Sequence, residues 1–327
     1  MDFDCHTVVV ILDTVFLCER QIIMVDKSFL NEIEAFADKG ALIMGEPLCN
    51  HTTFRVGGAA DAFLSVSNEE QLQKAVLLCK EYNVPFLVLG NGSNLLVSDD
   101  GYRGLVILIG KDMADIRVEG CRITALAGAP LASVAQTAAK HSLGGMEFAS
   151  GIPGTIGGAI VMNAGAYDGE MKMVVDEVRV LTQDGEFLTL SNEDLEFGYR
   201  TSRVKKEKLI VLSVTILLQP QEQMLIVEKM NDFAARRREK QPLEFPSAGS
   251  TFKRPEGMFA GKLIMDAGLR GYSVGDAQVS EKHCGFVINR GNATAKEISR
   301  LISDVQEKVK ESFGVSLETE VIFVGDF

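Results

Sequence analysis

Two glycine-rich stretches hold the residues whose types and spacing point first to ligand chemistry. The longer runs from Gly144 to Tyr167, GGMEFASGIPGTIGGAIVMNAGAY, and contains seven glycines. Glycine lets a ligand approach the backbone closely and leaves N–H groups free to point at one anion. The apolar AIVM that follows predicts a packed helix or strand behind the loop. The alternative is a glycine-rich turn between buried elements.

The second stretch, Pro85 to Val97, reads PFLVLGNGSNLLV and predicts a strand, an anion-binding turn and another strand. Gly90 and Gly92 match the first two glycines of a dinucleotide-binding fingerprint, but Leu95 stands where the third belongs. The following LLVSDDGYRGLVILI reads as extended chain, whereas a Rossmann crossover needs a helix there. We therefore reject a Rossmann unit.

Composition limits the classes of protein to consider. The chain has 327 residues, of which 46% are hydrophobic and 24% charged, as in an ordinary soluble globular protein with two or three subdomains. A net charge of −12 argues against nucleic acid or an acidic membrane as a partner. Six cysteines without a C-x-x-C pair indicate reduced thiols, and four histidines without H-x-x-x-H indicate no metal site.

The N-terminal segment TVVVILDTVFLC is not interpreted as a signal or membrane segment. Asp2 and Asp4 precede it and Asp13 interrupts it, and no run reaches the roughly 20 apolar residues that span a bilayer. We expect a cytoplasmic protein. Met24 is a plausible alternative start, so residues 1–23 are an open question.

Hydrophobic periodicity predicts an α+β fold. We expect helices over 27–39, 68–83, 131–140, 222–240, 261–268 and 294–313. Predicted strands include VILIG, IRVEGCRITALAG, LIVLSVTILLQP, CGFVIN, an alternating closing strand SLETEVIFVG, and a hairpin over 174–190 that turns at Asp184-Gly185. FGYRTSRVKKEK is expected to be a basic loop. The predicted divisions are 1–44 (extension and helix), 45–110 and 111–219 (two nucleotide-binding lobes), and 220–327 (substrate domain), with a boundary at Pro220.

Six motifs in order resemble one family. LGNGSNLLV, GIPGTIGGAIVMNAGAY, GYRTSRVKK, QPLEFPSAGSTFKRP, GYSVGDAQVSEKHCGFVINRGNATA and LETEV follow the pattern of bacterial UDP-N-acetylenolpyruvoylglucosamine reductases, over about residues 45–325. The short connection after GYR resembles the shorter subtype. The resemblance implies a vanillyl-alcohol-oxidase type of FAD fold. It also implies that NADPH reduces FAD, which reduces the enolpyruvyl ether of UDP-N-acetylglucosamine to the lactyl ether of UDP-N-acetylmuramate.

The resemblance implies three catalytic residues. Arg200 matches the family's catalytic arginine, and its planar fork suits a carboxylate; the alternative is a solvated basic loop. Ser250 matches the proton donor, polarised by a neighbour such as Lys253, whereas a serine after Gly249 is otherwise a turn residue. Glu320 matches a second acid, although spacing alone does not choose between it and Glu318.

The resemblance also implies ligand-binding residues. We expect non-covalent FAD on the two glycine-rich loops, through Leu89, Gly90, Asn91, Gly92, Ser93, Asn94, Ser150, Gly151, Pro153, Gly154, Thr155, Gly157, Gly158, Ala164 and Gly165. Candidates for the substrate are Tyr199, Arg237, Lys240, Lys253 and Lys262. Arg236 to Arg238 would also complement the dipole of a helix C-terminus. Arg254 stands where many relatives have asparagine, so we do not assign to this position the amide contact that those relatives would make. NADPH is the expected co-substrate, and a monomer is expected.

Two rival functions remain open. A flavin oxidase of the same fold would commonly tether its flavin through a histidine in the first loop, but residues 90–94 contain none and His51 lies upstream. A non-enzymatic nucleotide-binding module would need no general acid, so Ser250→Ala would then be silent.

Overall fold

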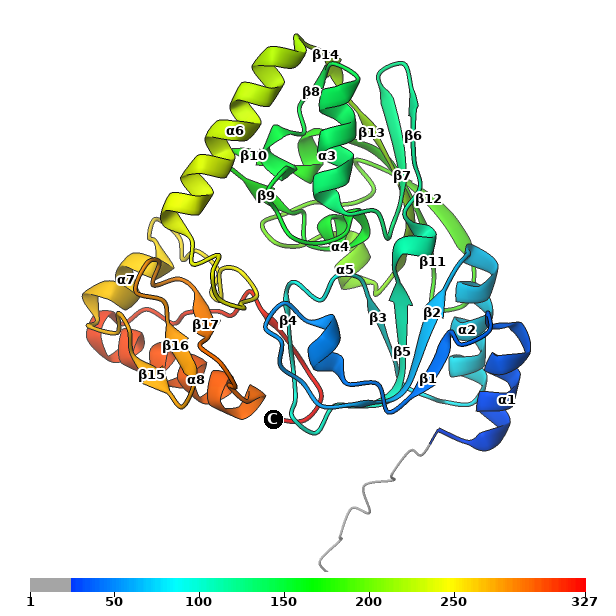
Figure 1. The fold of residues 1–327 in the computed structure, drawn as a ribbon, viewed down its shortest axis with the longest axis horizontal. Coiled ribbons are helices and arrows are strands. Elements are labelled where there is room, and N and C mark those ends of the chain that lie inside the picture. The colour runs from blue at the N-terminus through cyan, green and yellow to red at the C-terminus, as the bar shows by residue number, and fades with distance from the viewer. Residues whose placement is uncertain (1–24) are drawn as a thin grey trace, which may run out of the picture.

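A computed structural model describes residues 25–327, which form three lobes around a common centre (Figure 1). The first lobe has a four-stranded sheet in the order β1-β2-β5-β3, in which only β1 runs antiparallel to its neighbour. Its elements are α1 (Lys27–Phe36), β1 (Leu42–Met44), β2 (Ala60–Val66), α2 (Glu69–Glu81), β3 (Phe86–Leu89), β4 (Leu95–Val97) and β5 (Tyr102–Ile109). These include the predicted strand, turn and strand around Gly90. Asn68 caps α2 by accepting from the Gln71 N–H.

The second lobe is built on a five-stranded antiparallel sheet in the order β12-β11-β13-β7-β6. Its strands are β6 (Ile116–Glu119), β7 (Arg122–Leu126), β11 (Val175–Leu181), β12 (Phe187–Ser191) and β13 (Ile210–Leu217). The predicted hairpin is confirmed as β11–β12, with Gly185 at φ +82° in its turn. The predicted basic loop instead contains a one-turn helix, α5 (Arg203–Lys206), because Ser202 accepts from the Lys205 N–H and caps it.

The helices of this lobe pack on the second sheet and on one another. They are α3 (Leu131–Lys140), α4 (Ile156–Val161) behind the long glycine loop, and α6 (Gln223–Lys240). Short elements complete the structure. Two small antiparallel pairs form from β8 (Leu143–Gly144) with β14 (Gln219–Pro220) and from β9 (Gly165–Ala166) with β10 (Gly169–Glu170). The 3-10 helices are η1 (Leu48–His51), η2 (Lys111–Met113), η3 (Glu147–Ala149) and η4 (Met171–Met173).

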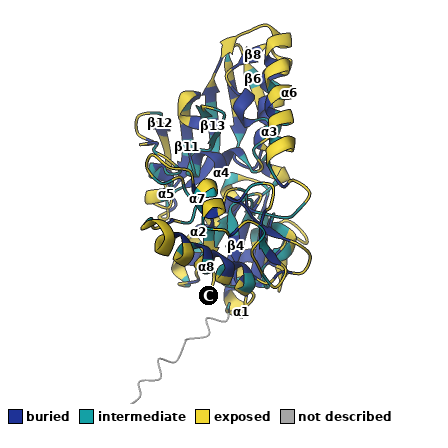
Figure 2. Cartoon of the chain, turned by 90° about the vertical axis from the view of Figure 1, so that its left-hand side faces the viewer, coloured by how far each residue is buried: buried dark blue, intermediate teal, exposed yellow. Residues whose placement is uncertain are grey.

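Helix α6 follows Pro220 but lies along the second lobe (Figures 1 and 2). It contacts α3 and β8, and the Phe233 ring stacks on Tyr167 with centroids 4.4 Å apart. Most of its surface is exposed, and Ile226 and Phe233 are its buried residues. A division of the chain into domains at Pro220 stays a prediction.

The C-terminal lobe contains α7 (Ala260–Asp266), α8 (Ala295–Phe313) and a three-stranded antiparallel sheet of β15 (Ser273–Val274), β16 (Ala277–Val279) and β17 (Val287–Asn289). The helix expected over 294–313 is confirmed as α8, and its apolar stripe is buried in the core of this lobe. Thr294 and Glu297 form a capping box at its N-terminus. Asp99 of the first lobe accepts from the Ala295 and Lys296 N–H groups at 2.7 and 2.9 Å, which ties the two lobes together.

The last strand, β18 (Ile322–Val324), returns to the first lobe and pairs in parallel with β4. The prediction of one alternating strand from Ser316 onward is wrong before Ile322. There the chain crosses between lobes and follows the loop at 250–253 instead: Phe252 bridges Thr319, and the Glu320 N–H donates to the Thr251 carbonyl at 2.8 Å. Within residues 25–327 no helix combines the length and apolar character needed to cross a membrane.

Candidate active site

A large cleft of about 1110 Å³ lies where the three lobes meet. We call it the glycine cleft, because its walls include Gly90, Gly110, Gly128, Gly151, Gly154 and Gly249. The two glycine-rich loops meet at one side of it, where the Ser93 hydroxyl donates to the Pro153 carbonyl at 3.0 Å. The cleft therefore brings together the two stretches that the sequence singled out.

Two of these glycines are required by the close approach and the backbone conformation of the two loops. A Cβ at Gly90 would lie 2.7 Å from Thr155 Oγ1 on the opposite loop. Gly154 has φ +138°, a conformation that other L-residues rarely adopt. At these points the wall consists of backbone, which suits a ligand that binds N–H groups.

Gly92 has a different explanation. It is buried, and a Cβ there would overlap the His51 carbonyl oxygen. The Thr53 N–H donates to the Gly92 carbonyl at 3.3 Å, so this glycine lets the segment around His51 approach the first loop. Gly157 likewise allows α4 to pack closely, since a Cβ there would lie 2.9 Å from the Ala127 Cβ. A role for either in holding a ligand stays a prediction.

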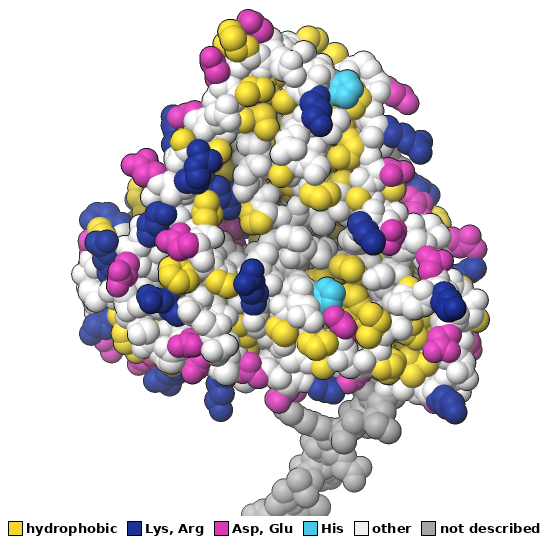
Figure 3. Space-filling view, in the orientation of Figure 1, with side chains coloured by type: hydrophobic (Ala, Val, Ile, Leu, Met, Phe, Trp, Pro, Cys, Tyr) yellow, Lys and Arg dark blue, Asp and Glu magenta, His cyan; other side chains and the backbone are white. Residues whose placement is uncertain are grey.

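A second cavity, of about 490 Å³, lies between the second and C-terminal lobes, and we call it the charged cavity. Of the predicted site residues, it brings together Tyr199, Arg200, Ser250, Lys262 and Glu320. Arg254, for which the sequence carried over no amide contact, also lines it, and sequence reasoning did not predict its other charged or polar residues, Arg270, Glu281, Lys282, His283 and Cys284. The face of the molecule in Figure 3 mixes Lys and Arg with Asp and Glu side chains.

Arg200 occupies the second position of a tight two-residue turn. Gly198 and Thr201 exchange backbone hydrogen bonds of 3.0 and 3.3 Å on either side of it. Arg200 has φ +56°, in the left-handed region, which costs a residue with a Cβ about 1–2 kcal/mol. The rest of the structure must therefore hold the turn, and the conformation aims the side chain into the cavity.

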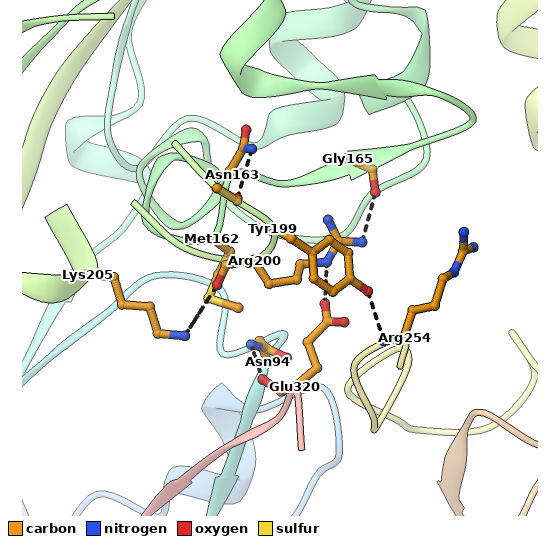
Figure 4. A network of polar contacts seen from close by, with 10 residues as sticks. Asn94, Met162, Asn163, Gly165, Tyr199, Arg200, Lys205, Arg254 and Glu320 are labelled. Carbon is orange, nitrogen blue, oxygen red and sulfur yellow. Dashed lines mark hydrogen bonds and ion pairs between the residues drawn. The ribbon is translucent and has the colours of Figure 1, made fainter. Parts of the chain in front are cut away.

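The guanidinium of Arg200 points at Glu320 (Figure 4). Its Nε lies 2.8 Å from Glu320 Oε1, and an Nη donates to the Gly165 carbonyl at 3.2 Å. The Tyr199 ring lies 5.3 Å from the guanidinium carbon. The alternative of a solvated basic loop is therefore wrong for this residue.

Glu320, not Glu318, faces the site. Its side chain is 15% exposed, and the Asn94 amide donates to its backbone carbonyl at 3.0 Å. Burial raises the pKa of Glu320, while Arg200 opposes that shift. Glu318 is exposed and pairs with Lys253 at 2.8 Å. Glu320 precedes the strand that begins at Ile322, so strand alternation does not set the direction of its side chain.

Ser250 is exposed at the wall of the charged cavity. It bridges Phe286 through the backbone, and the next residue, Thr251, donates its N–H to the Gly285 carbonyl at 2.8 Å. Lys253, expected to polarise it, does not line the cavity and binds Glu318 instead.

The remaining predicted substrate residues are dispersed. Lys262 lines the charged cavity but pairs with Asp266 at 2.8 Å. Arg237 lines the glycine cleft, where it donates to the Gly151 carbonyl. Lys240 lines neither cavity.

Comparison with known proteins identifies the family. A model described as UDP-N-acetylenolpyruvoylglucosamine reductase, C-terminal domain, matches residues 241–324, and an FAD binding domain model matches residues 60–191. The UDP-N-acetylenolpyruvoylglucosamine reductase of Agathobacter rectalis is 52% identical over 314 residues, which cover 92% of this chain and 100% of that protein. The chain belongs to the UDP-N-acetylenolpyruvoylglucosamine reductase family.

Further members of the reductase family agree. The reductase of Clostridium botulinum is 50% identical over 300 residues, covering 92% of this chain and 98% of its own. The crystal structure of the reductase MurB from Thermus caldophilus superposes with a TM-score of 0.75 at 36% identity, covering 87% of this chain and 98% of that one. The predicted family and the α+β fold with an FAD-binding domain are confirmed.

The glycine cleft fits the FAD that this reductase family implies. The Thr53 hydroxyl is buried without a hydrogen-bonding partner in the described structure, and Thr53 lines the cleft. An unpaired buried hydroxyl beside bare backbone walls is what a polar ligand would satisfy. The volume is also large enough for a dinucleotide.

Sequence reasoning missed part of the cleft wall. Residues 50–53 and Arg55 line it, although none of them was predicted as a site residue. His51, which seemed remote from the first loop in sequence, thus lies at the same cleft as Gly90. Its Nε2 is 2.8 Å from Glu46 Oε1, and its ring lies 4.4 Å from that of Phe63. The glycines at 57 and 58, just downstream, were the available signal.

Proposed function

We propose that this chain reduces the enolpyruvyl ether of UDP-N-acetylglucosamine to UDP-N-acetylmuramate, with NADPH as reductant and non-covalent FAD, in peptidoglycan precursor synthesis. The observation that carries the proposal is the Arg200–Glu320 ion pair, which shares the charged cavity with Ser250. The names of relatives at 50% and 52% identity support it.

The residues that would hold FAD are those of the two glycine-rich loops, together with Thr53 and its neighbours at the cleft. When bound, FAD supplies the substrate with the hydride that it has received from NADPH. Backbone N–H groups and small polar side chains would bind the diphosphate.

Arg200 would bind the enolpyruvyl carboxylate. Hydride addition to the terminal carbon leaves an enolate-like centre next to that carboxylate, and a fixed guanidinium fork stabilises the developing charge. The turn that holds Arg200 in place means that little reorganisation is needed when the charge forms.

Ser250 would deliver the proton that quenches this centre, and Glu320 would assist. The raised pKa of Glu320 keeps its carboxyl protonated to higher pH than an exposed glutamate, because burial disfavours the anion. Arg200 limits the rise in the pKa of Glu320. When Arg200 binds the substrate carboxylate, it would therefore also influence whether Glu320 holds a proton.

Cations around the charged cavity would meet the diphosphate of the substrate. Tyr199 and Lys262 line that cavity, as do Arg254, Arg270 and Lys282. Arg237, Lys240 and Lys253 lie outside it and remain candidates that would need to reorient. We further propose a cytoplasmic monomer with no nucleic-acid or membrane partner.

The test is Ser250→Ala, followed by stopped flow at the flavin absorbance. Flavin reduction by NADPH should keep nearly its normal rate, whereas reoxidation by the enolpyruvyl substrate should slow by roughly 10²-fold or more, the usual worth of a positioned acid. Ser250→Cys should recover part of the loss, because a thiol also donates a proton.

Two results would count against the proposal. Equal slowing of both half-reactions would make Ser250 a general structural or binding element. Unchanged reoxidation would favour a nucleotide-binding module without a general acid at this position.

A further inference from the structure

Lys205 faces the Arg200 turn from the helix that follows it. Helix α5 begins directly after the turn, and its cap, Ser202, is fully buried and donates to the Val161 carbonyl at 3.0 Å. Side chains of a helix lean toward its N-terminus, so Lys205 extends back over the turn. Its Nζ lies 3.5 Å from the Arg200 carbonyl oxygen and 3.6 Å from the sulfur of Met162 (Figure 4).

The turn is held from both ends by side-chain donors. The Asn163 amide donates to the Gly198 carbonyl at 3.1 Å, at the start of the turn. Lys205 donates to the Arg200 carbonyl, at its end. Asn163 is itself buried, and its carbonyl accepts from the Lys172 N–H at 3.0 Å. Left-handed backbone at a residue with a Cβ persists only where the surroundings over-determine it, and these two contacts do so here.

The ammonium of Lys205 lies among other charges of the site. Burial lowers its pKa, the positive charge of Lys253 lowers it further, and the carboxylate of Glu320 opposes both. Lys205 lines neither cavity, and its ammonium contacts the Arg200 turn instead. Any effect of Lys205 on the reaction must therefore pass through its neighbours.

We infer that Lys205 is a positioning residue whose ammonium, bound to the Arg200 carbonyl, fixes the turn that aims the guanidinium at Glu320. This inference rests on the proposed function, in which Arg200 binds the substrate carboxylate. Without that contact the turn can relax out of the left-handed region, and the guanidinium leaves the position in which it meets the carboxylate.

A double-mutant cycle separates this role from a general structural one. In the wild-type background, Lys205→Met should lower kcat/KM roughly tenfold, about 1.4 kcal/mol of transition-state stabilisation. In an Arg200→Ala background the same substitution should change kcat/KM by less than about twofold, because the residue through which it acts is gone. Lys205→Arg keeps a cationic donor and should recover most of the activity.

Lys206→Met is the matched control. Lys206 neighbours Lys205 on α5 but pairs with Glu196 at 2.7 Å on the exposed side, so its replacement should leave kcat/KM unchanged. Melting temperature and flavin content of each variant show whether it is folded. Substrate affinity, from the absorbance change of bound flavin on titration, should weaken for Lys205→Met alone of the two.

The outcomes distinguish the inference from the function beneath it. Equal losses from Lys205→Met in both backgrounds, or a loss matched by Lys206→Met, would overturn the positioning role while leaving Arg200 in place. A loss of less than about tenfold for Arg200→Ala by itself would overturn the proposed function instead. If Lys205→Met unfolds, Lys205→Arg decides: wild-type activity supports the inference, and a large loss in a folded variant contradicts it.

Discussion

The glycine cleft and the charged cavity adjoin in space but are built in opposite ways. The wall of the cleft includes six glycines, among them Gly90, Gly151 and Gly154, which leave the backbone bare at those points. The cavity is walled by long charged side chains from three separate parts of the chain, around Arg200, from Ser250 to Gly285, and at Glu320. The glycine cleft depends on positions that lack a side chain, whereas the charged cavity depends on side chains that meet from distant parts of the chain.

This difference determines what a substitution does. In the cleft a new side chain removes space, so the ligand is lost while the chemistry elsewhere stays intact. In the cavity a changed side chain alters charge or geometry at the reacting centre, so turnover is lost while the cofactor stays bound. Substitutions in each region, and one outside both, test this separation.

Arg200→Lys should have the largest effect. It keeps the positive charge but loses the planar fork, so we expect turnover to fall by roughly 10²-fold or more with flavin content unchanged. Steady-state kinetics and the flavin-to-protein absorbance ratio measure the two quantities. A loss below about tenfold, ~1.4 kcal/mol, would remove Arg200 from the mechanism.

Gly151→Val should break the cleft selectively. Gly151 has no positive φ, and a Cβ there would meet mainly the flexible Arg237 side chain, at 3.2 Å, so the fold should tolerate it. The branched side chain would project into the cleft, and we expect FAD to bind roughly tenfold more weakly or worse, about 1.4 kcal/mol.

Gly92→Val is the contrasting variant. Because a Cβ there would strike the His51 carbonyl, its loss of FAD should come with a lower melting temperature. Unfolding curves of the two apoproteins separate the cases. Strong destabilisation by Gly151→Val, or unchanged FAD affinity, would contradict the idea that omitted side chains shape the cleft.

Asp99→Ala tests a contact outside both sites. It removes two hydrogen bonds to the N-terminus of α8, so we expect a loss of about 1 kcal/mol and a melting temperature lower by about 2–4 °C. Asp100→Ala, the exposed neighbour, is the control. FAD affinity should stay unchanged; a weakened affinity would show that the lobe contact also shapes the cleft.

Glu320→Gln should show a small pH-dependent effect. Because burial raises the pKa of Glu320 in the folded protein, the wild type loses stability as pH rises from the unfolded pKa through the folded one. The amide that replaces the carboxyl does not titrate, so the melting temperature of the variant relative to wild type should rise by about 1–2 °C across that window. A difference that falls with pH would mean that Arg200 dominates and lowers the pKa instead.

The sequence predicted what local patterns encode. The helices expected over 68–83 and 294–313 and the Asp184-Gly185 turn each depend on residues close in the chain, and each is confirmed. The two glycine-rich loops were also visible, because a bare backbone wall requires runs of glycine.

Other features depend on partners far away in the chain. The predicted strand does not extend before Ile322 because the chain there contacts residues 251 and 252. His51 lies at the cleft wall because its segment packs on Gly92. Arg270 and Lys282 carry no local signal, since their side chains meet the cavity only after the C-terminal lobe docks. The resemblance supplied Arg200 and Glu320, which spacing alone did not distinguish from their neighbours.

The return of β18 to the first lobe has a consequence for synthesis on the ribosome. Val324 belongs to the same small core as Leu48, Leu89 and Val106, and the Asn94 contact with Glu320 joins residues 226 positions apart. Translation delivers the early lobes first, and domains begin to fold as they emerge. This core therefore stays incomplete, and the carboxyl of Glu320 stays away from Arg200, until residues 320–324 have left the exit tunnel. Nascent chains therefore carry both glycine loops without a working site until these residues emerge.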